Sequence, residues 1–325
     1  MSLRFMSPLA LVLAALPADT PAPARRAFTF SYTATLPAIP EGARNVAIWI
    51  PYPADDAHQR ISNVKLVGPG RAKIAKDPET GNSYASFAVD APRSGPLEVS
   101  LTFDVIRTEY VARAFAKADN LPVRKDDPEL ARFLQPDRLV PLDARVRQLS
   151  QEVTAGKPND LAKAHAIYDY VVSTMKYDKS GEGWGRGDIA WACDAKRGNC
   201  TDFHALFIGL TRAAGIPARF SIGFPLPGDK KEGEVAGYHC WAEFWLSGYG
   251  WVPVDASEAA KHPEKKEYFF GAHDENRVQL TTGRDLRLQP PQQGDPLNFF
   301  VYPYVEIDGK PWKDLSKSFS FRDKA

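Results

Sequence analysis

The chain has 325 residues, and its 41 basic side chains nearly balance 40 acidic ones, so that the formal net charge is +1. This balance gives no electrostatic reason to expect a nucleic acid or an acidic membrane surface as the partner. If the first 24 residues are set aside as a secretion signal, about 300 residues remain, a length that suits two domains or one domain with an appendage.

Residues 1–24 predict a secretion signal. A short basic start, MSLR, precedes the apolar run FMSPLALVLAALP, whose length suits a signal peptide and is too short to span a bilayer. Ala22-Pro23-Ala24 offers a cleavage site, with Ala18 as an alternative, and no cysteine lies near it to carry a lipid. We therefore expect an exported protein, periplasmic or secreted, that keeps no stable membrane anchor after cleavage.

Residues 25–110 predict a β-sandwich domain. FTFSYTATL, NVAIWIPYP and PLEVSLTFDV place apolar side chains at every second position, which is typical of strands that bury one face. Glycine and proline punctuate these strands, for example at Gly81 and at Gly95-Pro96. A small sandwich is the natural assembly, and it could serve as a support or position a substrate.

Residues 111–142 are polar and interrupted by proline, and they predict a linker with one helical turn. The next segments predict helices over residues 143–155 and 160–175. The second helix carries an apolar stripe typical of core packing, which consists of Leu161, Ala164, Tyr168, Val171, Val172 and Met175. The glycine-rich segment between Tyr177 and Cys200 lacks periodicity and predicts a long loop, of the kind that usually carries function.

A helix is predicted to begin at Cys200, with Asn199 as its cap and Gly215 near its end. The unpaired N–H groups and the dipole of the first turn favour a thiolate there. Asp202 opposes that thiolate, so an imidazolium would have to supply much of the stabilisation. Alternatively, Cys200 is only a small buried apolar residue.

The segment GYHCWAEFWL predicts a strand, SGYG a turn, and WVPVD a second strand. Alternation places His239 on the face opposite Cys240. Pairing Trp245 with Trp251 would bring Asp255 onto the face of His239, whereas a slip of one residue would move it away. A structural histidine and a strand-end cap are the alternatives. Together, the three residues are the nucleophile, base and orienting carboxylate that thiol-based acyl transfer requires.

GNCTDFHALFIGLTRAAGIPAR, YHCWAEFWL and GWVPVDAS together resemble the catalytic core of the transglutaminase-like superfamily, in its bacterial exported branch. The resemblance spans roughly residues 161–255. It implies a papain-like core with Cys200 as nucleophile, His239 as base and Asp255 as orienting acid. His204, at a position often small in relatives, and Cys240, directly after the histidine, are less standard.

The expected fold class is therefore α+β, an N-terminal β-sandwich followed by helices packed on an antiparallel sheet over residues 143–325. Strands are also expected in PLNFFVYPYVEIDGKPW, with a hairpin turn at Asp308-Gly309. We expect them to extend the sheet beside the three residues. Arg284 and Asp285 could reach the cleft, with a structural salt bridge as the simpler interpretation.

The resemblance implies cysteine-dependent acyl transfer on a peptide or protein substrate, with hydrolysis of amide bonds favoured and no cofactor. A protein cross-linking transglutaminase and a catalytically silent peptide-binding module are the alternatives. An intact Cys–His–Asp set argues against the silent module. In some transglutaminases a tryptophan donates to the oxyanion, and Trp184 and Trp191 are the candidates here, with packing as the alternative. The backbone N–H of Cys200 is the other donor.

The chain contains three cysteines, so one stays unpaired in an oxidising compartment. If Cys200 is a free thiol, Cys193 and Cys240 are the pair available for a disulfide. A zinc site built from these cysteines and His239 would lack any familiar ligand spacing. No metal is expected.

Overall fold

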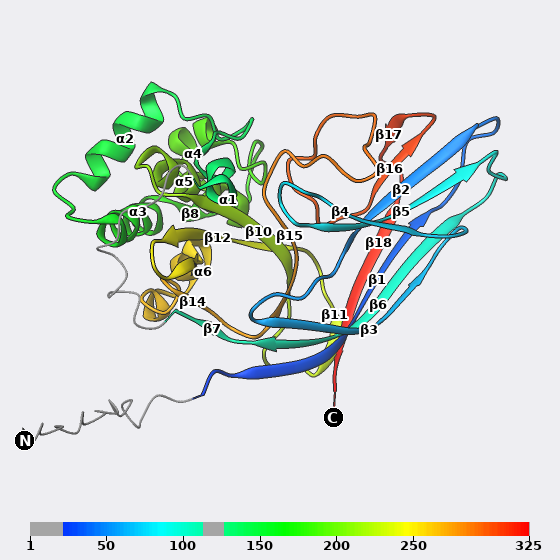
Figure 1. The fold of residues 1–325 in the computed structure, drawn as a ribbon, viewed down its shortest axis with the longest axis horizontal. Coiled ribbons are helices and arrows are strands. Elements are labelled where there is room, and N and C mark those ends of the chain that lie inside the picture. The colour runs from blue at the N-terminus through cyan, green and yellow to red at the C-terminus, as the bar shows by residue number, and fades with distance from the viewer. Residues whose placement is uncertain (1–21, 113–126, 325) are drawn as a thin grey trace, which may run out of the picture.

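The computed structural model describes residues 22–112 and 127–324. The predicted signal, apart from its last residues, and residues 113–126 of the predicted linker lie outside these ranges. Figure 1 shows two parts side by side: a body of helices around a small sheet, and a β-sandwich of long strands. Among the described residues, no helix is long and apolar enough to cross a membrane.

The sandwich consists of two five-stranded sheets, ordered β11-β18-β1-β6-β3 and β17-β16-β2-β5-β4. Its N-terminal strands are β1 (Arg25–Leu36), β2 (Asn45–Tyr52), β3 (Gln59–Val67), β4 (Lys73–Lys76), β5 (Ser83–Asp90) and β6 (Leu97–Thr108). The alternation predicted in β1 is confirmed, since every second side chain from Phe28 onward is buried: Phe28, Phe30, Tyr32, Ala34 and Leu36.

The C-terminal strands join this sandwich, so the expectation that they extend the sheet beside His239 is wrong. They are β16 (Tyr304–Ile307), β17 (Lys310–Trp312) and β18 (Ser316–Asp323). β16 pairs with β2 and β18 pairs with β1. The reason is core packing: the Phe319 ring lies 4.8 Å from that of Tyr32 and 4.2 Å from that of Phe224. The predicted turn at Asp308-Gly309 is confirmed, with φ of 49° and 74°.

The second part contains a four-stranded sheet, ordered β13-β12-β10-β15. Its strands are β10 (Ala218–Pro225), β12 (His239–Leu246), β13 (Gly250–Val254) and β15 (Arg277–Thr282). Short pairs of strands flank it: β7 (Tyr110–Val111) with β14 (Ala272–His273), and β8 (Lys176–Tyr177) with β9 (Arg197–Gly198). β11 (Glu232–Glu234) leaves this part between β10 and β12 to join the sandwich.

The helices are α1 (Pro128–Ala131), α2 (Ala144–Thr154), α3 (Asp160–Thr174), α4 (Ile189–Ala195), α5 (Cys200–Ala213) and α6 (Ala256–Lys261), with single 3-10 turns at Arg132–Leu134 and Pro263–Lys265. The predicted helices α2, α3 and α5 are confirmed. α5 is buried along its whole length, from Cys200 to Arg212, and packs against β12. Each large apolar side chain on it contributes about 1.5–3 kcal/mol by burial. The helix start is therefore held rigidly.

The sequence predicts a long loop between Tyr177 and Cys200, but part of this segment is helical. It contains α4, which Asp188 caps by accepting hydrogen bonds from the N–H groups of Ala190 and Trp191. Seven residues make barely two turns, too few for a helical period to emerge from the pattern. The boundaries predicted for the domains remain predictions.

Candidate active site

Cys200 is the first residue of α5 and is only 3% exposed. The cap predicted at Asn199 is confirmed, because its side-chain oxygen accepts a hydrogen bond from the N–H of Thr201 at 2.9 Å. The sulfur thus lies where the unpaired N–H groups and the dipole of the first turn stabilise negative charge.

Asp202, in the same turn, anchors the preceding glycine-rich segment. Its carboxylate accepts hydrogen bonds from the N–H groups of Asn199, Gly185 and Gly187 at 2.9, 2.7 and 2.9 Å. Burial raises the pKa of Asp202 despite these bonds. This anchoring was not predicted from the sequence, although an aspartate at the third helix position was the available signal for a capping box.

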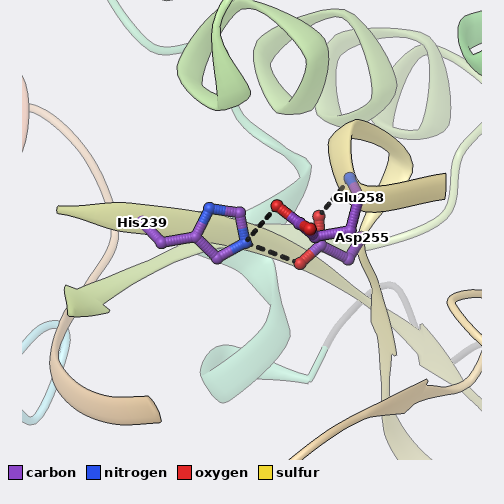
Figure 2. Close-up of side chains that lie close together, drawn as sticks. All are labelled: His239, Asp255 and Glu258. Carbon is purple, nitrogen blue, oxygen red and sulfur yellow. Dashed lines mark hydrogen bonds and ion pairs between the residues drawn. The ribbon is translucent and has the colours of Figure 1, made fainter. Parts of the chain in front are cut away.

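His239 and Asp255 come from the hairpin formed by β12 and β13. The predicted pairing of Trp245 with Trp251 is confirmed, and it brings Asp255 onto the face of His239. His239 Nε2 lies 2.7 Å from Asp255 Oδ2. In Figure 2 this nitrogen faces the carboxylates of Asp255 and Glu258, while the other ring nitrogen points away from them.

Cys200 and His239 each shift the pKa of the other, and Asp255 is hydrogen-bonded to His239, so the three side chains are linked through the imidazole. Burial alone would raise the pKa of the Cys200 thiol, but hydrogen bonds with Cys240 and His239 and the charge of His239 hold it well below its usual value. Burial alone would lower the pKa of His239, but the charge of Asp255 and its hydrogen bond raise it to about 10. These two pKa shifts favour a thiolate–imidazolium pair.

Asp255 is completely buried. Burial would raise its pKa, but the charge and the hydrogen bond of His239, with Arg277 nearby, hold the pKa well below its usual value. Its other oxygen accepts hydrogen bonds from Ser257 Oγ and the N–H of Glu258, both at 3.1 Å. Asp255 thus both caps α6 and orients the imidazole. The sequence left these two roles, strand-end cap and orienting carboxylate, as alternatives.

His239, Asp255 and Glu258 have the donor types of a metal site, and their ligand atoms lie within 4.8 Å of one another. However, Lys261 forms an ion pair with Glu258, and Arg277 Nη1 lies 3.5 Å from Asp255 Oδ2. These two cations already neutralise the carboxylates and would repel a metal ion. The hydrogen bond between His239 and Asp255 and these ion pairs explain the cluster.

The two less standard residues, His204 and Cys240, lie together behind the nucleophile. Cys240 Sγ is 3.7 Å from His204 Nδ1 and 3.8 Å from Thr201 Oγ1. His204 Nε2 accepts a hydrogen bond from the N–H of Ala256 at 3.2 Å, so the ring joins α5 to α6. Burial lowers the pKa of His204, which therefore supports the site as a neutral ring.

All three cysteines are free thiols, so the structure corrects the predicted disulfide between Cys193 and Cys240. Cys193 is half-buried on α4, whereas Cys240 is fully buried on β12, in contact with α5. Among the described residues, none of the three cysteines belongs to a cluster of possible metal ligands. Arg284 is structural, since its guanidinium donates to the carbonyl of Gly187 at 2.8 Å.

Neither tryptophan proposed for the oxyanion donates an indole N–H to the nucleophile among the described contacts. Trp184 Nε1 donates to the carbonyl of Gly181 at 3.1 Å. Trp191 packs against Gly183 and under the guanidinium of Arg197. The backbone N–H of Cys200 remains as the candidate donor, because the first residue of a helix has no partner in the preceding turn.

A groove of about 460 Å³ leads to His239. One wall is the chain from Glu234 to His239, and the other walls come from the end of β10, from α6 and from Tyr177. Tyr238 was not predicted from the sequence as a site residue; its hydroxyl is hydrogen-bonded to Thr201 Oγ1 at 2.7 Å and accepts a hydrogen bond from Asn199 Nδ2 at 3.0 Å. This tyrosine ties the groove wall to the start of α5.

A sequence model of the transglutaminase-like superfamily matches residues 147–256. A protein of Haemophilus influenzae is 29% identical over 322 residues, which cover 87% of this chain and 86% of that protein. YebA of Bacillus subtilis is 28% identical over 159 residues, covering 43% of this chain and 21% of YebA.

The structure is similar to the crystal structure of a candidate cysteine protease from Cytophaga hutchinsonii. The TM-score is 0.58 at 18% identity, and the match covers 92% of this chain and 100% of that one. At this identity the likeness concerns the fold alone. Together with the sheets and helices described above, it confirms the α+β class expected from the sequence.

Proposed function

Because residues 147–256 belong to the transglutaminase-like superfamily, we propose that this chain is an exported cysteine enzyme that hydrolyses amide or peptide bonds. The superfamily match and the fold support cysteine-dependent chemistry in general. One observation carries the finer proposal: at the end of a groove, His239 is hydrogen-bonded to Asp255 and lowers the pKa of Cys200 at the start of α5.

In the proposed first step, the Cys200 thiolate attacks the carbonyl carbon of the amide and forms a C–S bond. The carbonyl oxygen becomes an oxyanion, which the backbone N–H of Cys200 is positioned to stabilise. The imidazolium of His239 then gives its proton to the amine nitrogen, and the C–N bond breaks. Asp255 stabilises the charged imidazole and fixes its orientation throughout.

In the second step, neutral His239 takes a proton from water, and the resulting hydroxide attacks the acyl-enzyme. The C–S bond breaks, which restores the thiolate–imidazolium pair and releases the acid. We favour water over an amine as the acceptor. Transamidation needs a second site that holds the amine and keeps water out, whereas hydrolysis needs only water at the acyl-enzyme.

The proposed substrate is a peptide or protein, met outside the cytoplasm after cleavage of the predicted signal. Neither a nucleic acid nor a stable membrane anchor is part of the proposal, because the charge of the chain is balanced and the apolar leader is short.

The test incubates the protein, from residue 25 onward, with a complex peptide mixture and a labelled primary amine. Mass spectrometry then measures new peptide termini, glutamine deamidation and amine incorporation. The proposal predicts hydrolysed products that are absent with Cys200→Ala. Amine-labelled products in excess of hydrolysed ones would favour the cross-linking alternative. Products that persist in Cys200→Ala would contradict the proposed nucleophile.

A further inference from the structure

β11 connects the sandwich directly to the candidate active site. It lies in the chain between β10 and β12, and His239 follows Glu234 by five residues. In the strand order of its sheet it is an edge, paired with β18 on one side. Figure 1 shows β11 where the two parts of the molecule meet.

The hydrogen bonds of β11 establish which groups face outward. The N–H of Val235 donates to the carbonyl of Phe319 at 2.9 Å, and the N–H of Asp323 donates to the carbonyl of Lys231 at 2.6 Å. In an antiparallel ladder, alternate residues bond to the partner strand. The N–H and C=O groups of Glu232 and Glu234 therefore point away from β18, and no backbone group among the described residues bonds them.

The last residue of β11, Glu234, lines the groove that leads to His239. Glu234 and the residues that follow it form one wall, and no residue of β18 lines the groove. Glu232, Glu234 and Ala236 are exposed. The unpaired backbone donors and acceptors of β11 therefore end at the groove that leads to the reactive residues.

The opposite edge of the same sheet differs. β3 is interrupted by a bulge between Ser62 and Lys65, an irregularity that discourages the pairing of another chain. β11 pairs with β18 without a shift in register. The free edge that is regular is thus the one beside the groove.

We propose that β11 binds an extended peptide substrate as an added strand, through the backbone groups of Glu232 and Glu234. The inference rests on the proposed function and narrows its substrate class to polypeptides that can adopt an extended conformation. Recognition through the main chain tolerates many side-chain sequences, and pockets for alternate side chains then add preference. The continuity of the edge with the groove favours a substrate strand over a second copy of this chain.

The test uses a reactive probe, N-acetyl-tetra-alanine chloromethyl ketone, which alkylates a thiolate with loss of chloride. Its second-order rate at Cys200 is divided by the rate for iodoacetamide, a reagent too small to need the strand. Probes with a single N-methyl group at each successive amide then remove one donor at a time. Strand addition predicts that methylation at alternate amides lowers the ratio roughly 2- to 10-fold per lost hydrogen bond. Methylation at the amides between them leaves the ratio unchanged.

A matched pair of variants tests the protein side. Glu234→Pro removes the outward N–H, and proline is tolerated at an edge where the N–H faces solvent. Glu234→Ala, which changes the side chain and keeps the N–H, is the reference. The ratio is expected to be roughly 2- to 10-fold lower for the proline variant than for the alanine variant.

Uniform effects along the probe, or equal ratios for the two variants, would overturn the role of β11 while leaving the nucleophile intact. An edge that instead pairs two copies of the chain would also overturn it. In that case Glu234→Pro changes sedimentation and not the ratio. If iodoacetamide itself does not single out Cys200, the proposed function fails. Anisotropy of a fluorescent tetra-alanine peptide then measures binding to β11 directly, with the same alternation expected.

Discussion

Asp255→Asn tests how much the buried carboxylate contributes to the activation of Cys200. The substitution removes one negative charge and nearly keeps the shape. Asparagine is as good a helix cap as aspartate, so the bond from the N–H of Glu258 and the start of α6 are retained. Any change in reactivity then reports the charge rather than a misfolded hairpin.

The magnitude follows from the contact between His239 Nε2 and Asp255 Oδ2, which is 2.7 Å long and buried. A hydrogen bond to a charged group contributes about 1.5–3 kcal/mol, which corresponds to about one to two pKa units. The pKa of His239, raised to about 10 by Asp255, is expected to fall by that amount. Because the imidazolium in turn stabilises the thiolate, the pKa of Cys200 is expected to rise.

The assay is the rate of iodoacetamide alkylation across pH, followed by peptide mapping, in a Cys193→Ser background. The wild-type pKa of Cys200 lies well below that of an ordinary thiol, so rapid alkylation should persist below neutral pH. In Asp255→Asn the acidic limb should move to higher pH, with rates near pH 6 lower by about tenfold or more.

The matched control is Asp169→Asn, which removes another Asp–His contact, 3.1 Å from His165 and outside the groove. Its profile should coincide with wild type. An unchanged profile in Asp255→Asn would refute the idea that this carboxylate maintains the ion pair.

Three further predictions concern the surroundings of the site and the fold. Asp202→Ala leaves three backbone N–H groups without their acceptor. We therefore expect the free energy of unfolding to fall by about 3 kcal/mol and hydrogen exchange at Gly185 and Gly187 to become faster. Unchanged exchange would contradict the anchoring role of Asp202. Hydrogen bonds from Asn63, Lys324 and Thr29 lower the pKa of Asp104 to about 2, so the stability that they add is present above the ordinary pKa of aspartate and is lost as pH falls toward 2. Between about pH 4 and pH 2, the free energy of unfolding measured in urea should therefore fall less in Asp104→Asn than in wild type. If the free energies of both proteins fall equally with pH, this role of Asp104 is contradicted. Because all three thiols are free, a reducing agent should leave the melting temperature unchanged and thiol titration of the denatured protein should find three groups; a decrease on reduction would indicate a disulfide.

The local features of the site were predictable from the sequence because they depend on near neighbours. The cap at Asn199, the helix from Cys200 and the turn that pairs Trp245 with Trp251 each depend on a few adjacent residues. Once that register is set, side-chain alternation brings Asp255 to His239. The placement of Asp255 beside His239 could therefore be derived from the sequence. The resemblance to the transglutaminase-like superfamily then indicated the type of reaction.

The features that the sequence did not predict depend on contacts between distant segments. The period-two pattern of residues 304–323 indicates strands but does not specify the sheet, which is decided by packing of Phe319 against Tyr32 and Phe224. Likewise, the count of three cysteines left Cys193 and Cys240 as a possible disulfide if Cys200 stays free. In the structure both are free thiols, Cys193 half-buried and Cys240 fully buried. The role of Asp202 depends on where the glycine-rich segment folds back.

The most direct test of the central claim is a search for an acyl group on Cys200. The protein is mixed with p-nitrophenyl acetate, the release of nitrophenol is followed, and the acid-quenched protein is mapped by mass spectrometry. The account predicts a burst of about one equivalent, an acetyl group on Cys200, and loss of both in Cys200→Ala and His239→Ala. Acetylation at other residues, or a burst that survives Cys200→Ala, would contradict the assignment of Cys200 as the nucleophile.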